Sequence, residues 1–289
     1  MTTYAYFPGC CVGGGHGRSY GESLRAVFSH LGLGLEEIPD WNCCGATAYA
    51  SINEEKAVAL AARNLALAEG MRKDVVAPCA ACYLVLYKAK HTLSTYPHLA
   101  EKVRKGLDEA GLSYQGTADV RHPLDILVND VDPQKLADSI RQPLAGYRAA
   151  PYYGCQVVRP FATFDDGLRP QSLDRLLKLL GADVVDYPLK SRCCGGTLMN
   201  TMEEVGLRLN FLLLKEARER GANVLVTLCP LCQFNLEVYQ GKLKRTYGED
   251  VTLPVVYFTQ LMGLAFGLSP RALGLQRNFV VTAPLPVPA

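Results

Sequence analysis

The residues that could do chemistry in this 289-residue chain are its eleven cysteines. With Cys11 set aside, the other ten form two series, each with a single cysteine, a Cys-Cys pair and a Cys-x-x-Cys motif. The pair and the motif are 34 residues apart in both series. The first series is Cys10, Cys43-Cys44 and Cys79-Ala-Ala-Cys82, and the second is Cys155, Cys193-Cys194 and Cys229-Pro-Leu-Cys232. This match indicates a duplicated unit whose thiols act together.

The number of thiols indicates the kind of site. A structural zinc ion takes four ligands, commonly from two Cys-x-x-Cys-like hooks, whereas each series has five cysteines and one such hook. Soft thiolates at this density favour iron–sulfur assembly. Zinc or free core thiols are the alternatives, with zinc the weaker reading of the N-terminal series. Thiol–disulfide exchange is less favoured, because its Cys-x-x-Cys motif needs no Cys-Cys pair upstream.

The segments around the cysteines repeat an alternation of strands and helices. Each unit has three short apolar strands, each followed by a cysteine group, and two helices between them. The expected strands are 4–7, 35–38, 74–77, 149–153, 183–187 and 223–227, and the expected helices are 22–31, 53–71, 171–180 and 202–220. Glu54-Glu55 and Glu203-Glu204 open the longer helices, where acidic residues suit the helix dipole. The pattern predicts an α/β fold of two pseudo-symmetric domains, each a small, mainly parallel sheet flanked by helices.

The two domains are expected at 1–147 and 148–289, with a helical satellite segment at 91–147 in the first. Within that segment His122-Pro123-Leu124 reads as a helix start, where His122 would cap or pack, and Asp132-Pro133 opens another short helix. Residues 251–270 read as a strand followed by a core helix at 258–266, and residues 283–289 as a loose tail.

The composition excludes several classes of function. A formal charge of +2 and scattered basic residues predict no nucleic-acid binding. The N-terminal residues lack a basic and an apolar signal region, and no stretch reads as a membrane span, so we expect a cytoplasmic protein. Thiols stay reduced in the cytosol, which argues against disulfides.

The cysteine pattern, taken with its flanking residues, resembles the cysteine-rich CCG-domain family. Within this family it resembles the B-type subunit of heterodisulfide reductase, including its homologues in sulfur-oxidising bacteria, and the resemblance covers nearly the whole chain. The segments that carry it besides the remaining cysteines are Tyr6-Phe7-Pro8-Gly9-Cys10, Ile38-Pro39-Asp40-Trp41-Asn42-Cys43-Cys44-Gly45, Val120-Arg121-His122-Pro123-Leu124, Phe258-Thr259-Gln260-Leu261, Gly263-Leu264 and Gly274-Leu275.

This resemblance implies two noncubane [4Fe–4S] clusters, each held by five thiolates and flanking a cleft where a disulfide is split. It also implies partners: a ferredoxin-like [4Fe–4S] subunit that delivers electrons and a flavoprotein that feeds it. The implied ligands are Cys10, Cys43, Cys44, Cys79 and Cys82 for the first cluster and Cys155, Cys193, Cys194, Cys229 and Cys232 for the second.

The first series departs from the family pattern after Cys10. The family shows one cysteine there and then a polar segment, whereas this chain continues Cys11-Val12-Gly13-Gly14-Gly15-His16-Gly17-Arg18. Cys11 could be a bystander, a substitute ligand or a thiol facing the substrate. His16 and Arg18 are candidate contacts to an anionic substrate, or else part of a solvated loop.

The expected function is therefore that of the catalytic subunit of a heterodisulfide reductase-like complex, an oxidoreductase acting on sulfur groups. It would reduce or form a disulfide or persulfide, with a disulfide, a thiol or a protein-bound dithiol as substrate. The alternative is a CCG-domain electron-transfer subunit of a succinate/fumarate, lactate/glycolate or quinone-linked oxidoreductase. A zinc-stabilised assembly module without redox chemistry is a third reading.

Overall fold

The computed structural model describes residues 2–46 and 49–280, and its strands form two four-stranded sheets. Every strand pairing is parallel, and the strand order is β2-β1-β3-β4 in the first sheet and β6-β5-β7-β8 in the second. One order becomes the other when each strand is replaced by the strand four places further along the chain. The α/β fold with two pseudo-symmetric units is therefore confirmed.

The strands are short and lie in register across each sheet. Ala5 pairs with Glu36 on one side and with Val75 on the other, and Ala149 occupies the corresponding place between Val184 and Val224. The strands are β1 (Thr3–Tyr6), β2 (Gly34–Glu37), β3 (Val75–Val76), β4 (Val120–Arg121), β5 (Arg148–Tyr152), β6 (Asp183–Val184), β7 (Val224–Thr227) and β8 (Val255–Tyr257).

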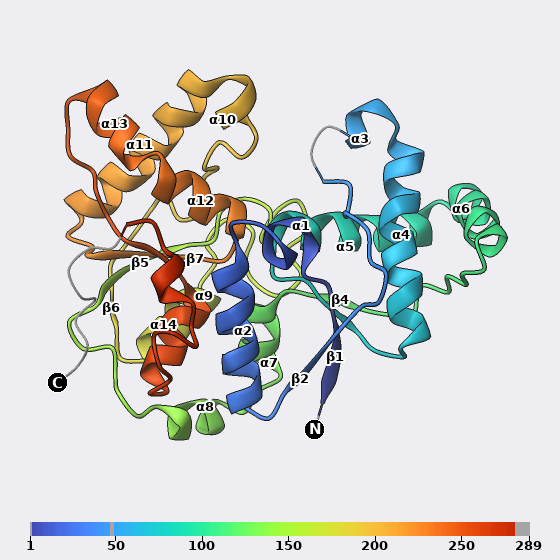
Figure 1. The fold of residues 1–289 in the computed structure, drawn as a ribbon, viewed down its shortest axis with the longest axis horizontal. Coiled ribbons are helices and arrows are strands. Elements are labelled where there is room, and N and C mark those ends of the chain that lie inside the picture. The colour runs from blue at the N-terminus through green and yellow to red at the C-terminus, as the bar shows by residue number, and fades with distance from the viewer. Residues whose placement is uncertain (1, 47–48, 281–289) are drawn as a thin grey trace.

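Helices connect and cover both sheets (Figure 1). Those of the first half are α1 (Gly9–Gly13), α2 (Arg18–His30), α3 (Tyr49–Ile52), α4 (Glu54–Gly70), α5 (Ala80–Thr95), α6 (Pro97–Glu109), α7 (Pro123–Asn129) and α8 (Pro133–Ser139). Those of the second half are α9 (Ser172–Leu179), α10 (Leu198–Thr201), α11 (Glu203–Glu219), α12 (Pro230–Val238), α13 (Gln240–Tyr247) and α14 (Phe258–Ala265), with a 3-10 turn at Leu275–Arg277.

The four helices expected between the strands are present, and local chemistry sets their ends. Asn53 caps α4, since its side chain accepts a hydrogen bond from the backbone N–H of Lys56, and Glu54 and Glu55 lie in the first turn. The expected helix at 22–31 begins earlier, at Arg18, because the glycine-rich segment before it turns tightly into α2.

The segment 91–147, expected to be a helical satellite, also contains a strand that the sequence interpretation missed. Its residues Val120 and Arg121 form β4, which pairs with Val75 and Val76 and completes the first sheet. Two residues between polar neighbours carry too short a pattern to be recognised as a strand. The two short helices expected after it are present as α7 and α8, and so are the strand and helix within 251–270, as β8 and α14. The tail at 283–289, expected to be loose, lies outside the described residues.

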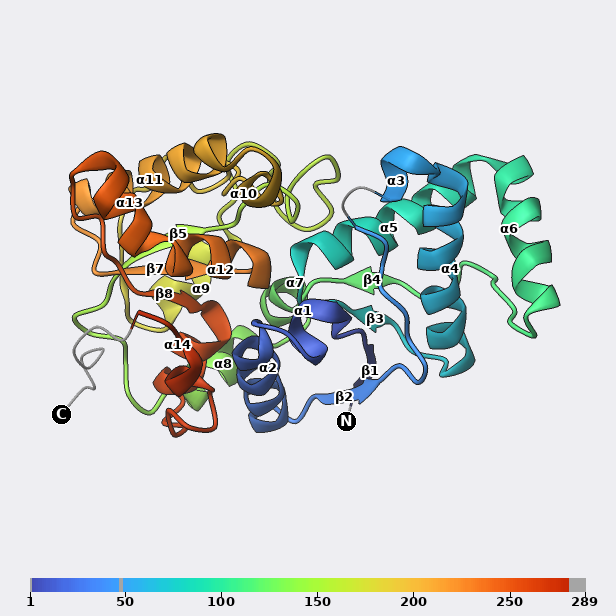
Figure 2. The ribbon, with the colours of Figure 1, turned by 45° about the horizontal axis from the view of Figure 1, so that its top comes forward.

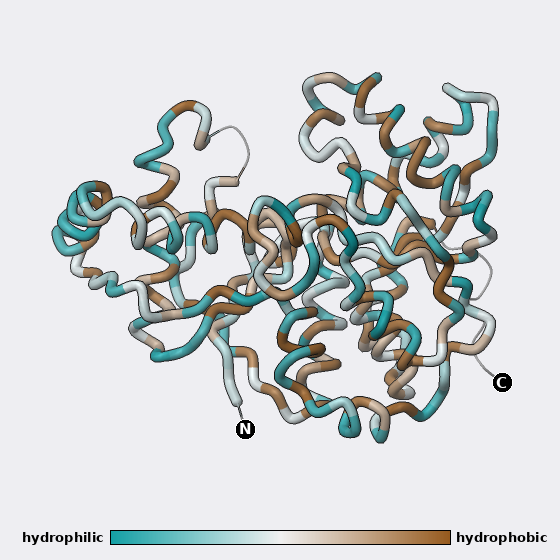
Figure 3. Tube along the Cα trace, turned by 180° about the vertical axis from the view of Figure 1, so that it is seen from behind, coloured by the Kyte–Doolittle hydropathy of each residue, from teal (hydrophilic) through white to brown (hydrophobic). Residues whose placement is uncertain are grey.

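The two halves share one buried boundary. Helices α2 and α14 lie side by side between the sheets (Figures 1 and 2), and the hydroxyls of Ser23 and Thr259 are 2.6 Å apart there, fully buried. Hydrophobic and hydrophilic stretches alternate along the helices (Figure 3), and one core cluster contains side chains from both halves. Among the described residues, no helix combines the length and the apolar character that a membrane crossing requires.

Candidate functional site

Both cysteine series begin at the carboxyl ends of parallel strands. In each sheet the chain passes from the central strand to one neighbour and then crosses to the other side, so β1/β3 and β5/β7 are topological switch points. Ligands in open α/β sheets bind in the crevice at such points. Cys10 and Cys79 follow β1 and β3, and Cys155 and Cys229 follow β5 and β7, so these four thiols lie at the two crevices.

In the first set, the thiols of the Cys-Cys pair meet those of the Cys-x-x-Cys motif. The sulfurs of Cys44 and Cys82 are 3.4 Å apart, and both residues are buried. The hydrogen bond with Cys82, supported by the backbone N–H of Ala46, lowers the pKa of Cys44 to about 7, so its thiolate is favoured. Cys43 interacts with Cys10, and both are exposed.

The second set has the same arrangement. The sulfurs of Cys194 and Cys232 are also 3.4 Å apart. Hydrogen bonds from the Cys155 and Cys194 thiols, helped by the nearby Arg159 guanidinium, hold the pKa of Cys193 far below its usual range. Sequence reasoning did not identify Arg159 as a site residue, because it follows Cys155 in a segment without regular structure.

The two sets meet at one point on the domain boundary. Hydrogen bonding with Cys229 raises the pKa of Cys79, while Cys229 has its pKa lowered, first by Cys232 and then by Cys79. Both thiols are fully buried, and each stands at the N-cap of a helix, α5 and α12 respectively. The positive end of the α12 dipole favours a thiolate at Cys229, in the direction of its lowered pKa. Each set therefore has exposed thiols at one end, Cys10 and Cys43 in the first and Cys193 in the second. Its buried end is Cys79 or Cys229 at this junction.

Glycines let the backbone approach the thiols closely in both copies. Gly9 and Gly154 hold the corresponding position in the two copies, with φ of +64° and +68°. A Cβ atom at Gly9 would lie 2.8 Å from the Cys82 sulfur, and one at Gly154 would lie 3.3 Å from the Cys232 sulfur. The donors are all soft thiols, which suits an iron–sulfur cluster. Within residues 2–46 and 49–280, no three His, Cys, Asp or Glu side chains are gathered around one point as ligands of a single metal ion.

The three candidate residues in the divergent segment after Cys10, which are Cys11, His16 and Arg18, have different surroundings. Burial, followed by the neighbouring Cys10, raises the pKa of the half-buried Cys11 to about 12, so its thiol keeps its proton. The His16 ring packs on Phe234 of α12 at 4.6 Å, so it belongs to the domain boundary rather than to a solvated loop. Arg18 is exposed and forms an ion pair with Glu22, and its contact with an anionic substrate stays a prediction.

Three buried asparagines that sequence reasoning missed hold the Cys-Cys loops. In the first copy Asn64 of α4 accepts a hydrogen bond from the backbone N–H of Asn42 at 2.9 Å. In the second copy Asn210 of α11 donates to the Cys194 carbonyl at 3.0 Å, and Asn235 of α12 donates to the Gly196 carbonyl at 2.9 Å. An asparagine within the apolar stripe of each long helix is the signal that could have identified Asn64 and Asn210.

His122 ties the first half to the second. Its Nδ1 accepts a hydrogen bond from the backbone N–H of Leu124 and caps α7, so the expected capping role is confirmed. The proton must then lie on Nε2, which donates to the carbonyl of Leu228 at 3.2 Å. Leu228 precedes Cys229, so this bond fixes the backbone at the junction between the two sets.

We expect Asn210→Ala to destabilise the protein by about 2 kcal/mol, because the Cys194 carbonyl loses its 3.0 Å donor and keeps only the 3.5 Å contact with Asn235. The loop that carries Cys194 should loosen at the same time. Urea unfolding followed by circular dichroism measures the change. Asn200→Ala, at an exposed position of α10, is the matched control and should change stability by less than about 0.5 kcal/mol. Equal effects of the two substitutions would contradict the positioning role of Asn210.

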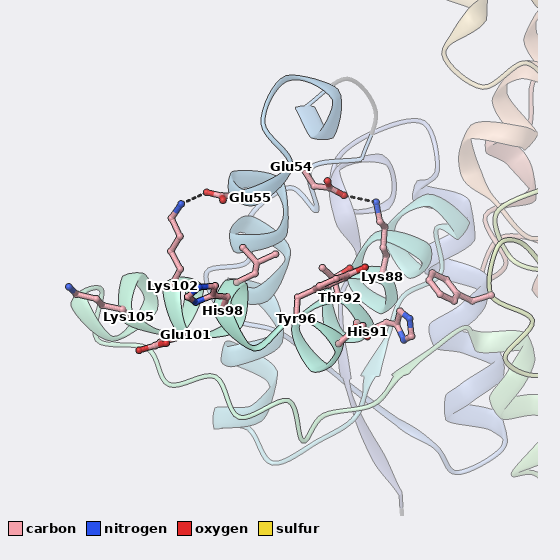
Figure 4. A pocket seen from close by; sticks show the side chains of 13 residues that line it. Glu54, Glu55, Lys88, His91, Thr92, Tyr96, His98, Glu101, Lys102 and Lys105 are labelled. Atoms are coloured by element: carbon pink, nitrogen blue, oxygen red, sulfur yellow. Dashed lines mark hydrogen bonds and ion pairs between the residues drawn. The ribbon is translucent and has the colours of Figure 1, made fainter.

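A surface cavity of about 990 Å³ lies away from the thiols, between α4, α5 and α6 (Figure 4). Lys88 and Lys102 point across it toward Glu54 and Glu55, forming ion pairs at its rim. No cysteine lines it. This cavity is therefore separate from the site that the cysteines define.

Comparison with known proteins agrees with the geometry of two matching thiol sets. The model of a cysteine-rich domain, CCG, matches residues 4–87 and again residues 149–237. The chain belongs to this CCG cysteine-rich domain family and carries two copies of its domain.

Among its relatives, the chain is 33% identical over 279 residues to the 8-methylmenaquinol:fumarate reductase membrane anchor subunit of Wolinella succinogenes, covering 96% of each chain. It is 30% identical over 285 residues to the B-type subunit of the ferredoxin/F420H2-dependent CoB-CoM heterodisulfide reductase of Methanosarcina acetivorans, covering 97% of this chain and 94% of that one. A solved structure of a hypothetical protein from Helicobacter pylori shares the fold with a TM-score of 0.77 at 17% identity, over 98% of this chain and 52% of that one.

Proposed function

We propose that this chain is the iron–sulfur redox subunit of a heterodisulfide reductase-like complex and reduces or forms a disulfide or persulfide bond. The observation that carries the proposal is the presence of two equivalent cysteine sets on one boundary. The Cys44–Cys82 and Cys194–Cys232 sulfurs are each 3.4 Å apart, and His122 of the first half hydrogen-bonds to Leu228, the residue before Cys229. A substrate with two sulfurs needs two adjacent acceptor sites, and a pseudo-symmetric pair of thiol sets supplies them. The relative named as the B-type subunit of a heterodisulfide reductase supports this choice.

The ten cysteines would hold two noncubane [4Fe–4S] clusters. The first would use Cys10, Cys43, Cys44, Cys79 and Cys82, and the second would use Cys155, Cys193, Cys194, Cys229 and Cys232. When bound, such clusters supply electrons one at a time and iron sites with affinity for sulfur. The chain itself contributes the positions of the thiolates, the burial of the junction and the hydrogen bonds from Asn210 and Asn235 that orient the second Cys-Cys loop.

The overall reaction sets what the partners must deliver. Reducing one disulfide consumes two electrons and two protons, breaks the S–S bond and releases two thiols; disulfide formation is the reverse. We propose that a ferredoxin-like [4Fe–4S] subunit, itself served by a flavoprotein, exchanges these electrons with this chain. The exposed cysteines Cys10, Cys43 and Cys193 mark where the two sets reach the surface.

The second candidate is an electron-transfer subunit of a fumarate, lactate or quinone-linked oxidoreductase. The relative named as a subunit of 8-methylmenaquinol:fumarate reductase, at 33% identity over 96% of the chain, favours it. In this role the same thiol sets would pass electrons between partners without splitting a sulfur–sulfur bond.

Iron analysis and a thiol titration test these alternatives. Anaerobically prepared protein should contain about eight irons and eight sulfides per chain, the content of two [4Fe–4S] clusters. A low-molecular-weight thiol added to the oxidised protein should produce a new paramagnetic signal. A cluster-loaded protein that responds to quinol and never to thiols would favour electron transfer alone. A colourless, zinc-containing protein would overturn both redox functions.

A further inference from the structure

One tyrosine of the first half is buried against the cysteines of the second. Tyr20 lies in the first turn of α2 with no exposed surface. Its ring stacks on Tyr257 with centroids 4.3 Å apart and planes 9° from parallel. Tyr257 is the register partner of Thr227, two residues before Cys229. The stack therefore places Tyr20 beside the strand end that carries Cys229.

The backbone next to Tyr20 confirms this close approach. A Cβ atom at Gly17 would lie 2.6 Å from the Cβ of Pro230, the residue after Cys229. The buried hydrogen bond between Ser23 and Thr259 then fixes the following turn of α2 against α14. Tyr20 is thus held by contacts on both sides and has little freedom to move its ring.

The hydroxyl of Tyr20 has no hydrogen-bond partner in the described part of the chain, although it is fully buried. A buried hydroxyl without a partner is costly, and such groups are rare unless they serve a ligand or a water. Burial raises the pKa of Tyr20 well above its usual range, so the oxygen keeps its proton. The group is a donor without an acceptor, on the side of the boundary where Pro230 follows Cys229.

We propose that the Tyr20 hydroxyl donates a hydrogen bond to the sulfur shell of the second cluster at Cys229, so that the first half of the chain tunes the redox potential of the second site. This inference rests on the proposed function, because it requires a cluster at the second cysteine set. A hydrogen bond to a cluster sulfur stabilises the more negative, reduced state. Removing it should lower the reduction potential.

Tyr20→Phe tests the proposal because it removes only the hydroxyl and keeps the stack on Tyr257. Redox titration of the cluster-loaded protein, followed by electron paramagnetic resonance, should show a second-cluster reduction that is about tenfold less favourable, ~59 mV for one electron. Tyr6→Phe is the matched control. Its hydroxyl is also buried without a partner, but Arg25 and Glu37, rather than cysteines, are the charges that act on it. It should leave both potentials unchanged.

Two further proteins cover the remaining outcomes. In a Cys194→Ser background that retains only the first cluster, Tyr20→Phe should have no effect on its potential. If Tyr20→Phe alone loses iron, 3-fluorotyrosine placed at position 20 keeps the ring and strengthens the donor, and the second-cluster potential should then rise. Full iron content with wild-type potentials in Tyr20→Phe, or no rise with fluorotyrosine, would overturn the proposal. Wild-type protein without iron would instead overturn the proposed function.

Discussion

Cys194→Ser should reduce the iron content of the protein from about eight to about four atoms per chain, because only the second cluster depends on this thiol. Cys194 is buried, and its sulfur lies 3.4 Å from that of Cys232, at the centre of the second set. A serine oxygen is a harder and poorer ligand for iron than a thiolate. Iron and sulfide analysis of anaerobic protein measures the loss, and electron paramagnetic resonance identifies the cluster that remains.

Two other cysteines give this experiment its controls. Cys11→Ser should keep the full iron content, since Cys11 lies outside both sets of five. Cys229→Ser should lose at least half of the iron, because Cys229 belongs to the second set and also influences the pKa of Cys79 in the first. Loss of both clusters in Cys194→Ser, or of neither, would contradict the assignment of five cysteines to each site.

Gly9→Ala should disrupt the first site and lower the free energy of unfolding by about 2–3 kcal/mol. A non-glycine residue at a φ of +64° costs about 1–2 kcal/mol. The added Cβ would also stand 2.8 Å from the Cys82 sulfur, so the buried thiol must shift, and overpacking adds about 1 kcal/mol or more. Urea unfolding measures the loss of stability, and iron analysis should show the loss of one cluster.

The second copy provides the matched comparison for Gly9. Gly154→Ala has a similar φ of +68°, but its Cβ would be 3.3 Å from the Cys232 sulfur. It should therefore cost about 1–2 kcal/mol, mostly from the backbone, and keep more of its iron. Gly70→Ala, at the end of α4 with no atom within 4 Å of the new Cβ, should be neutral or slightly stabilising. Equal losses at all three positions would show that contact with the thiols is not the cause.

The sequence predicts the α/β class, the duplication and most helices, because these depend on patterns that extend over many residues. The 34-residue gap between Cys44 and Cys79 recurs between Cys194 and Cys229, and this repeat identifies corresponding segments even where the strands are short. The apolar strands that lead into Cys79 and Cys229 follow from the same comparison.

Features that depend on contacts between distant segments could not be predicted in this way. The strand β4 is only two residues long, so its role appears only through its pairing with β3. The contact between Cys79 and Cys229 depends on how the two halves pack, which neither repeat specifies. His16 of the glycine-rich segment packs on Phe234 of α12, and Tyr20 of α2 stacks on Tyr257 of β8. The sequence contains no periodic signal for either contact.

The two sheets have equivalent strand orders, so one chain contains two copies of the same unit. Two separate single-copy chains could have formed the same arrangement as a dimer. In a symmetric dimer every substitution is made twice, because both subunits carry the same residue. Here the segment from Cys11 to Gly17 is present in one half only, and it supplies His16 to the boundary once. Because the two copies lie in one chain, the two sites are not identical, and a single substitution can change one site without changing the other.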